Sequence, residues 1–408
     1  MKRDLHTLSC CVASVTSAVR WLCCGVASVM SAVRWLCCGV ASVTSAVRWL
    51  CCGVASVTSA VRWLCCGVAS VTSAVRWLCC GVAAAFFLVA CVDEDEYPNT
   101  PQGNFEALWQ IIDQHYCFLD YKQHEYGLDW QQVYNKYKVR VNSHMDSQQL
   151  FEVLAAMLSE LRDGHVNMNA AHDYARNWSW YEDFPTNFSD SLQRSYLGKD
   201  YKIAAGLLYR VLDDNIGYIR YESFQQGIGD GNLNEVLSEF ITCNGLIIDI
   251  RSNGGGNLSN AQKLAARFAH EKTLVGYIQH KTGKGHGDFS DMEPRYLEPS
   301  SQLRWHKPVC ILTNRHVYSA ANEFTLYMKA LPNVKLVGDH TGGGAGMPFS
   351  SSLPNGWSVR FSAVPMYDTQ RQPAEFGIEP DYRVDLTAED FRRGKDTIIE
   401  FARKLLAE

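Results

Sequence analysis

Cysteine is almost absent from most of the chain. Of the 16 cysteines among the 408 residues, only Cys117, Cys243 and Cys310 lie beyond residue 91. Three widely spaced cysteines do not form a disulfide framework, which needs several pairs of cysteines, or a zinc site, which needs ligands at close, regular spacing. The sequence also lacks a His-Glu-x-x-His motif, which argues against a zinc peptidase. We therefore expect a fold held together by its hydrophobic core, with no metal and no cofactor.

Acidic residues are almost absent from residues 1–90, which hold one of the 43 Asp and Glu but seven of the 38 Lys and Arg. The rest of the chain has 31 basic and 42 acidic residues, a formal net charge of −11. Binding to a phosphate backbone needs clustered Lys and Arg, so we expect no nucleic acid partner. With 47% hydrophobic residues, the chain is able to bury a substantial core of one or two domains.

Long uninterrupted hydrophobic runs are also missing. Residues 1–90 contain five copies of the fourteen-residue unit VASVTSAVRWLCCG, which begin at Val12, Val26, Val40, Val54 and Val68 and differ only where Met30 replaces a threonine. An arginine in every copy interrupts the apolar runs before they reach the length of a membrane-spanning helix. Solenoid units are longer, about twenty residues or more. We interpret the array as a recent tandem duplication, or as translation from a start placed too far upstream.

The last copy leads into a different pattern. Arg76 is followed by the apolar segment WLCCGVAAAFFLVAC, which ends at Cys91, and then by an acidic segment. A basic residue, a short apolar core and small residues are the parts of a secretory signal peptide. The LVAC sequence resembles the lipobox of bacterial lipoproteins, whose cysteine is lipidated. The resemblance implies a lipid anchor at Cys91 in the cell envelope. By the same resemblance, Val92 directly after the cysteine implies the outer membrane, and the acidic run 93–96 favours surface display.

We divide the remaining chain into an acidic linker at 91–103, a helical domain at 104–162, a larger domain at 163–387 and a C-terminal helix at 388–408. Apolar residues recur at intervals of three and four in the helical domain, which is typical of amphipathic helices.

Short apolar strands and helical segments alternate in the larger domain. The predicted strands lie at 245–250, 274–278, 309–313 and 334–338, after a hairpin pattern at 206–224. Alternation of this kind predicts an α/β fold whose sheet is covered by helices on both faces.

Three glycines, Gly254–Gly256, follow the strand at 245–250, where backbone N–H groups can approach a ligand closely. Their spacing does not match a dinucleotide-binding motif, because Ser259 stands where a third glycine is required, and no Gly-Lys-Ser or Gly-Lys-Thr follows. A tight turn is one interpretation. The other is an oxyanion hole, whose amides stabilise the charge of a tetrahedral intermediate.

Ser319 follows the strand at 309–313 and opens the predicted helix SAANEFTLYMKAL. A lone serine at this position is commonly a helix cap. It is also a position where the helix dipole and the N–H of Ala320 would stabilise an oxyanion beside a nucleophilic hydroxyl. A nucleophilic serine needs a base. The candidates are His165, His316 and His340, and sequence spacing does not choose between them.

Five segments occur in order between about residues 150 and 385: LSELRDGHV, GLIIDIRSNGGG, VCILTNRHVYSAANEF, VGDHTGGGAG and EFGIEPDYRV. Together they resemble the tail-specific, or C-terminal processing, serine peptidases, and in particular their tricorn-like branch. The resemblance implies a crotonase- or ClpP-like ββα catalytic domain after a small helical domain. It also implies peptidase activity on a peptide or protein substrate. The span after His165 is too short for the PDZ domain that many relatives insert.

The resemblance also implies roles for single residues. Ser319 corresponds to the nucleophile of the family, and Gly255 and Ala320 to its oxyanion donors. Relatives with a Ser-Lys dyad have a lysine where this chain has Gly344. The base is then the histidine of the tricorn-like branch, His165, oriented by Glu375.

Two further positions depart from the family pattern. Asn322 stands where the family has a glutamate, three residues after the nucleophile. Gly164 stands where tricorn-like relatives have a serine directly before the histidine. Asp163 is therefore a second candidate to orient His165, although aspartate is also a common turn residue.

The alternative function is a non-catalytic module that binds peptides or lipids, because retinoid-binding repeats of the vertebrate eye resemble the same family. The presence of a serine, a histidine and an acid together favours the enzyme. We therefore expect a serine endopeptidase that cleaves envelope or extracellular proteins and peptides by acyl transfer.

Overall fold

The computed structural model describes residues 97–176 and 178–408. The repeats, the signal-like segment and Cys91 lie outside the described residues, so the predictions made for them stay predictions. Within the described ranges, none of the helices combines the length and the hydropathy that crossing a bilayer requires.

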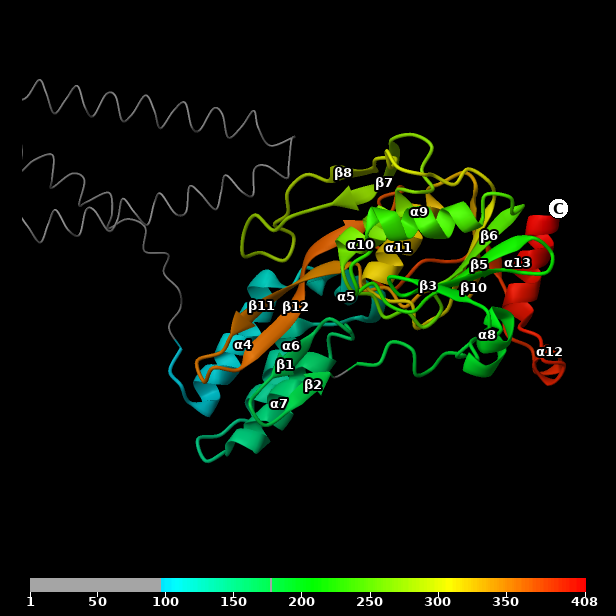
Figure 1. The fold of residues 1–408 in the computed structure, drawn as a ribbon. Helices are drawn as coiled ribbons and strands as arrows, with labels where there is room; N and C mark the ends of the chain where they lie inside the picture. The colour runs from blue at the N-terminus through cyan, green and yellow to red at the C-terminus, as the bar shows by residue number, and fades with distance from the viewer. Residues whose placement is uncertain (1–96, 177) are drawn as a thin grey trace, which may run out of the picture. The chain divides into compact units, whose positions relative to one another are not determined.

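Four helices come first in the described chain (Figure 1). They are α4 (Pro101–His115), α5 (Leu119–Tyr126), α6 (Trp130–Lys138) and α7 (Ser147–Ser159). The helices α4, α6 and α7 begin where the side chains of Thr100, Asp129 and Asp146 accept backbone N–H groups of the first turn. Their apolar faces share one core with buried strand residues such as Phe361. The helical region is therefore packed directly on a sheet.

That sheet has six strands in antiparallel pairs, in the order β2-β1-β12-β7-β8, with β11 also paired to β12. The strands are β1 (Asn167–Asn169), β2 (Tyr174–Arg176), β7 (Thr273–Ile278), β8 (Glu293–Leu297), β11 (Gly346–Ser352) and β12 (Ser358–Tyr367). Since β12 pairs with three other strands, it joins the segment after His165 to the glycine-rich segment before β11.

The second sheet has seven strands in the order β13-β10-β9-β6-β5-β4-β3. They are β3 (Lys202–Ala204), β4 (Leu207–Val211), β5 (Ile216–Tyr221), β6 (Gly245–Asp249), β9 (Val309–Thr313), β10 (Val334–Gly338) and β13 (Tyr382–Arg383). The five strands from β5 to β13 run parallel, and β4 and β5 form the predicted hairpin. Every residue of β5, β6 and β9 is buried, as expected for a sheet covered on both faces.

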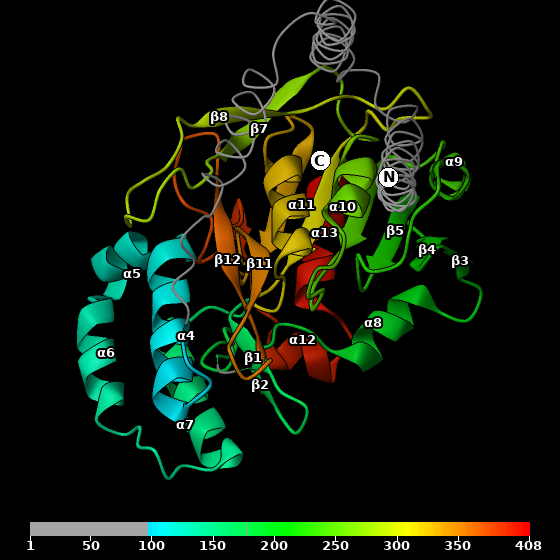
Figure 2. The same cartoon turned by 90° about the vertical axis from the view of Figure 1, so that its left-hand side faces the viewer.

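Helices cover both faces of the seven-stranded sheet. On one face lie α9 (Asp230–Glu239), α10 (Leu258–Ala265) and α11 (Ala320–Lys329), and Figure 2 shows α10 and α11 side by side. On the other face lie α8 (Asp190–Leu197) and α13 (Thr397–Ala407). The predicted α/β fold is confirmed. Between β2 and β4 the described chain holds only α8 and β3, so no PDZ domain is present there.

The C-terminal segment differs from the single helix predicted for residues 388–408. It consists of α12 (Ala388–Arg392) and α13, separated at Gly394, whose φ of 72° lies in the left-handed region. Asp396 then starts α13 by accepting the N–H groups of Ile398 and Ile399. The helix breaks because a glycine in this conformation ends one helix and a capping aspartate starts the next.

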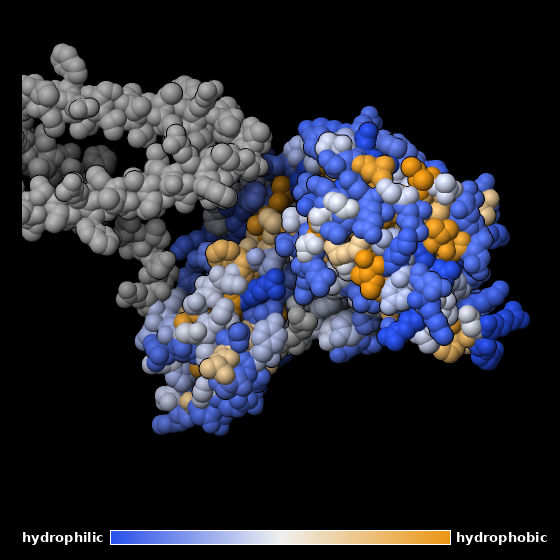
Figure 3. Space-filling model, in the orientation of Figure 1, coloured by the Kyte–Doolittle hydropathy of each residue, from blue (hydrophilic) through white to orange (hydrophobic). Residues whose placement is uncertain are grey.

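The face of the molecule drawn in Figure 3 has no large apolar patch among the described residues. Hydrophobic residues form small separate groups among hydrophilic ones there. Isolated groups of this kind are normal for a protein surface and need no partner to cover them.

Candidate active site

Ser319 lies between the end of β9 and the start of α11, and its backbone has φ 57° and ψ −124°. These angles are unusual for a residue other than glycine, and such conformations cost about 1 to 3 kcal/mol. Two glycine-rich segments hold the turn, because the Tyr318 N–H donates to the Asn253 carbonyl at 3.1 Å and the Ser319 N–H to the Gly343 carbonyl at 2.9 Å. The Ser319 side chain makes no capping hydrogen bond. Its hydroxyl is therefore held out from the helix end and is not used as a cap.

His165 lies in the turn between α7 and β1 and is 5% exposed. Its Nε2 is 2.9 Å from the Ser319 Oγ, a hydrogen-bond distance at which the imidazole is able to accept the hydroxyl proton. His316 instead stacks on Tyr181 with ring centroids 4.2 Å apart, and His340 contacts Arg315 at 2.8 Å. The structure thus brings one of the three candidate bases to the serine.

Asp163 anchors the backbone of the base. Its carboxylate accepts the His165 N–H at 2.7 Å and the hydroxyls of Tyr116, Tyr318 and Ser362 at 2.9, 3.2 and 2.8 Å. Burial alone would raise the pKa of Asp163, but the charges of Lys122 and His165 and these hydrogen bonds outweigh burial and lower it. An ionised Asp163 therefore fixes the turn that carries the imidazole.

Glu375 is also buried in this cluster. One carboxylate oxygen is 3.3 Å from the Lys122 Nζ, and the other accepts the Ala345 N–H at 3.1 Å. Burial raises the pKa of Glu375 to about 8; the negative charge of Asp163 adds to this effect, and Lys122 opposes it. Glu375 thus interacts with Lys122, Ala345 and the charge of Asp163, and its own charge depends on pH near neutrality.

Lys122 is a residue of the site that sequence reasoning missed. It lies on α5, its side chain is fully buried, and its Nζ donates to the Arg162 carbonyl at 3.0 Å as well as to Glu375. The Phe376 ring lies 4.9 Å from the ammonium. A lysine in the polar stretch YKQHEY is typical of an exposed helix face, so the sequence held no sign of its burial.

The two predicted oxyanion donors both lie beside Ser319. A Cβ added to Gly255, whose φ is +97°, would come within 2.9 Å of the Ala320 nitrogen and the Ser319 Cβ. As the first residue of α11, Ala320 has no acceptor for its N–H within the helix. The Gly255 N–H, however, donates to the Asn253 Oδ1 at 2.9 Å. Ala320 is therefore the donor that is placed for an oxyanion in this conformation, and Gly255 would have to release Asn253 first.

Two aromatic rings explain the departures at Gly164 and Gly344. The rings of Trp180 and Tyr318 stack with centroids 3.8 Å apart. A Cβ on Gly164 would lie 2.5 Å from the Trp180 ring, and a Cβ on Gly344 would lie 2.5 Å from the Tyr318 ring. The stacked pair thus fills the space that a serine before the base and a dyad lysine would need.

The buried Asn322 has a structural role. Its amide oxygen accepts the Thr341 hydroxyl at 2.6 Å, which ties α11 to the segment before the glycines. The next residue, Glu323, is paired with Arg295. The glutamate expected after the nucleophile is thus replaced here by a buried amide.

A side chain at Gly344 should destabilise the protein. Gly344 and Gly356 both have positive φ, 76° and 84°, but a Cβ on Gly356 meets no atom within 4 Å. Gly356→Ala should lower the free energy of unfolding by about 1 kcal/mol through backbone strain alone. Gly344→Ala should lower it by about 2 to 4 kcal/mol, because overlap with Tyr318 adds to the strain. Denaturant unfolding of both variants measures the difference, and equal losses would mean that the Tyr318 ring does not occupy this space.

Ser319 opens onto a cavity of about 210 Å³. Its lining residues are Gly256, Asn257, Leu258, Ser319, Gly344, Gly346, Met347, Pro348, Arg360 and Met366. Among residues 97–176 and 178–408, no group of three or more His, Cys, Asp or Glu side chains is arranged to hold a metal ion. The Ser319 hydroxyl and the Arg360 guanidinium line this cavity, and the His165 imidazole lies beside the hydroxyl.

Comparison with known proteins places these features in a family. Residues 215–384 match the model described as peptidase family S41, and residues 97–159 match the model of the tricorn protease C1 domain. A crystal structure described as a "putative peptidase" from Parabacteroides merdae is 50% identical, with a TM-score of 0.72. The similarity covers 76% of this chain and 98% of that one.

The curated relatives are longer proteins. The tricorn protease of Thermoplasma acidophilum is 27% identical over 199 residues, which are 47% of this chain and 17% of that protein. A Chlamydia muridarum protein is 27% identical over 117 residues, which are 28% of this chain and 20% of that protein. This chain thus spans about a fifth of the length of the curated relatives it matches.

Proposed function

Because the chain belongs to peptidase family S41, a family of serine peptidases, we propose that it is an endopeptidase that cleaves peptide bonds through an acyl-enzyme on Ser319. The observation that carries this proposal is the distance of 2.9 Å between the Ser319 Oγ and the His165 Nε2. The strained turn at Ser319 and the absence of a capping bond from its side chain support the same role.

The residues would act in a fixed order. His165 Nε2 takes the Ser319 proton as Oγ bonds to the peptide carbonyl carbon, and the Ala320 N–H receives the charge of the carbonyl oxygen. The imidazolium returns the proton to the leaving amine as the C–N bond breaks. A water molecule then repeats these steps on the acyl ester and frees Ser319. Glu375, when it is ionised, supports the imidazolium by its charge, and Asp163 holds the backbone at the base.

Hydrolysis of an unstructured peptide tests this function. Wild-type protein should cleave the peptide, and Ser319→Ala should leave no activity above the background of the preparation. Ser301→Ala, at an exposed serine outside the cavity, should retain wild-type activity. Cleavage by Ser319→Ala would contradict the role of this hydroxyl. A folded wild-type protein that binds peptides or lipids without cleaving any would support the binding module instead.

We propose in addition that the protein is anchored to the cell envelope, in the outer membrane, by lipid on Cys91. The apolar segment that ends in LVAC and the change to acidic sequence after it support this location. Mass measurement of protein extracted from membranes should give a chain that begins at a lipidated Cys91. An unmodified Cys91 still joined to Ala90 would overturn the proposal.

A further inference from the structure

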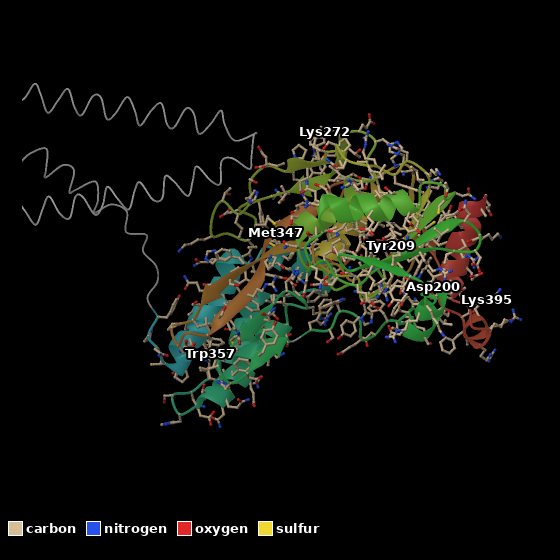
Figure 4. The ribbon with its side chains drawn as sticks, in the orientation of Figure 1. Asp200, Tyr209, Lys272, Met347, Trp357 and Lys395 are labelled. Carbon is tan, nitrogen blue, oxygen red and sulfur yellow. The ribbon has the colours of Figure 1, made fainter. Side chains whose placement is uncertain are left out.

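The cavity at Ser319 has an apolar wall and one charged side chain. Leu258, Met347, Pro348 and Met366 supply the apolar wall, and Figure 4 places Met347 at the end of β11 nearest to α10. Of the ten lining residues only Arg360 is charged, and none is acidic. A cavity of about 210 Å³ is smaller than the 300 to 1,000 Å³ of typical ligand pockets. It therefore fits one or two side chains of a peptide.

Arg360 is exposed and lies in the middle of the six-stranded sheet. On β12, Arg360 pairs with Asn167 of β1 on one side and with Ser350 of β11 on the other. Asn167 in turn donates to the His165 carbonyl at 3.1 Å. The sheet thus fixes the backbone of Arg360 in register with the strand that follows the base, and its side chain lines the cavity onto which Ser319 opens.

The charge of Arg360 is not balanced within the described part of the chain. Three arginines elsewhere in the fold hold carboxylates: Arg251 binds Asp249 and Asp396, Arg267 binds Asp230, and Arg295 binds Glu323. Among the described residues, Arg360 has neither an ion pair nor a hydrogen-bond acceptor for its guanidinium.

An unpaired guanidinium beside an apolar wall recognises one kind of group well. Arginine presents a planar set of donors that binds a carboxylate through two parallel hydrogen bonds. From these observations we propose that Arg360 binds a carboxylate of the substrate, so that the enzyme prefers peptides with an acidic residue next to an apolar residue at the bond that is cleaved. This inference rests on the proposed function of Ser319.

The carboxylate has two possible sources, an acidic side chain or the C-terminus of the substrate, and the proposal commits to the side chain. The test uses pairs of peptides that differ only by glutamate or glutamine at one position, within three residues of a leucine. Their C-termini are amidated, so a difference within a pair measures the effect of the side-chain carboxylate alone. Comparison of the glutamine peptide with a free C-terminus and its amidated form measures the effect of the terminal carboxylate alone. Mass spectrometry of the products locates the cleaved bond in each.

Wild-type enzyme should cleave the best glutamate peptide with a kcat/KM about 2- to 5-fold higher than that for its glutamine partner, as expected for one ion pair at an exposed site. Arg360→Gln should bring this ratio close to one, and Arg360→Lys should leave an intermediate ratio. Arg392→Gln, on α12, should keep the wild-type ratio. Salt at 0.5 M should reduce the wild-type preference, because the pair is exposed.

Each outcome decides the proposal. A wild-type ratio near one, or a ratio that Arg360→Gln leaves unchanged, would overturn it. A preference for the free C-terminus alone, lost in Arg360→Gln, would move the recognition from the side chain to the chain end. Cleavage of none of the peptides by folded wild-type protein would instead refute the proposed function.

Discussion

Replacing His165 by alanine is expected to lower kcat/KM for an unstructured peptide by about 10⁴- to 10⁶-fold, because loss of the base leaves the Ser319 hydroxyl in its weakly nucleophilic protonated form. The residual rate would come from binding and from the oxyanion donor alone. Circular dichroism and denaturant unfolding check that the variant is folded.

His316→Ala is the matched control for this experiment. His316 lies three residues before Ser319, but its ring stacks on Tyr181 and burial lowers its pKa. We expect His316→Ala to change kcat/KM by less than about threefold. If His165→Ala kept near wild-type turnover while Ser319→Ala had none, another group, such as His316 or His340, would be the base and the assignment of His165 would be wrong.

Replacing Glu375 by glutamine should have an effect that grows with pH. Since burial raises the pKa of this carboxyl to about 8, it is mainly protonated at pH 7 and mainly ionised at pH 9. Only the ionised form is able to stabilise the imidazolium that forms when His165 takes the proton. The ratio of the wild-type kcat/KM to that of Glu375→Gln should therefore be within a few-fold of one at pH 7. It should reach about 10 to 100 at pH 9, the effect expected for one charge near another in the interior.

Asp163→Asn provides the contrast. The pKa of Asp163 is lowered, so this carboxyl is already ionised at pH 7 and the effect of its loss should not change between pH 7 and 9. This variant should also lose stability, since an amide cannot accept all four of the hydrogen bonds that Asp163 receives. A ratio for Glu375→Gln that stays constant from pH 7 to 9 would contradict the pH-dependent charge, and a larger catalytic loss in Asp163→Asn would transfer the supporting role to Asp163.

The sequence was sufficient for those parts of the fold that depend on local patterns. The apolar strands at β6, β9 and β10 and the hairpin of β4 and β5 appear where their residue types predicted them, because buried strands need continuous apolar residues. The choice of His165 over His316 and His340 came from family resemblance. Distances across the fold, which the sequence spacing does not contain, show that His165 reaches Ser319.

The parts that could not be predicted depend on contacts between distant segments. Lys122 comes to Glu375 from 253 residues away, and nothing near it in the sequence indicates burial. Trp180 and Tyr318 fill the space beside Gly164 and Gly344, a packing that follows only from the folded chain. Gly394 is different, since a glycine inside the helical pattern predicted for residues 388–408 could have indicated the break between α12 and α13.

The central claim is that Ser319 is a nucleophile activated by His165, and reaction with a fluorophosphonate tests it most directly. The serine oxygen bonds to phosphorus and fluoride leaves, so the adduct has a defined mass and its position can be mapped by peptide sequencing. We expect one adduct per chain, on Ser319, with none in Ser319→Ala and much slower formation in His165→Ala. Equal labelling of wild type and Ser319→Ala, or no labelling of folded wild-type protein, would contradict the claim.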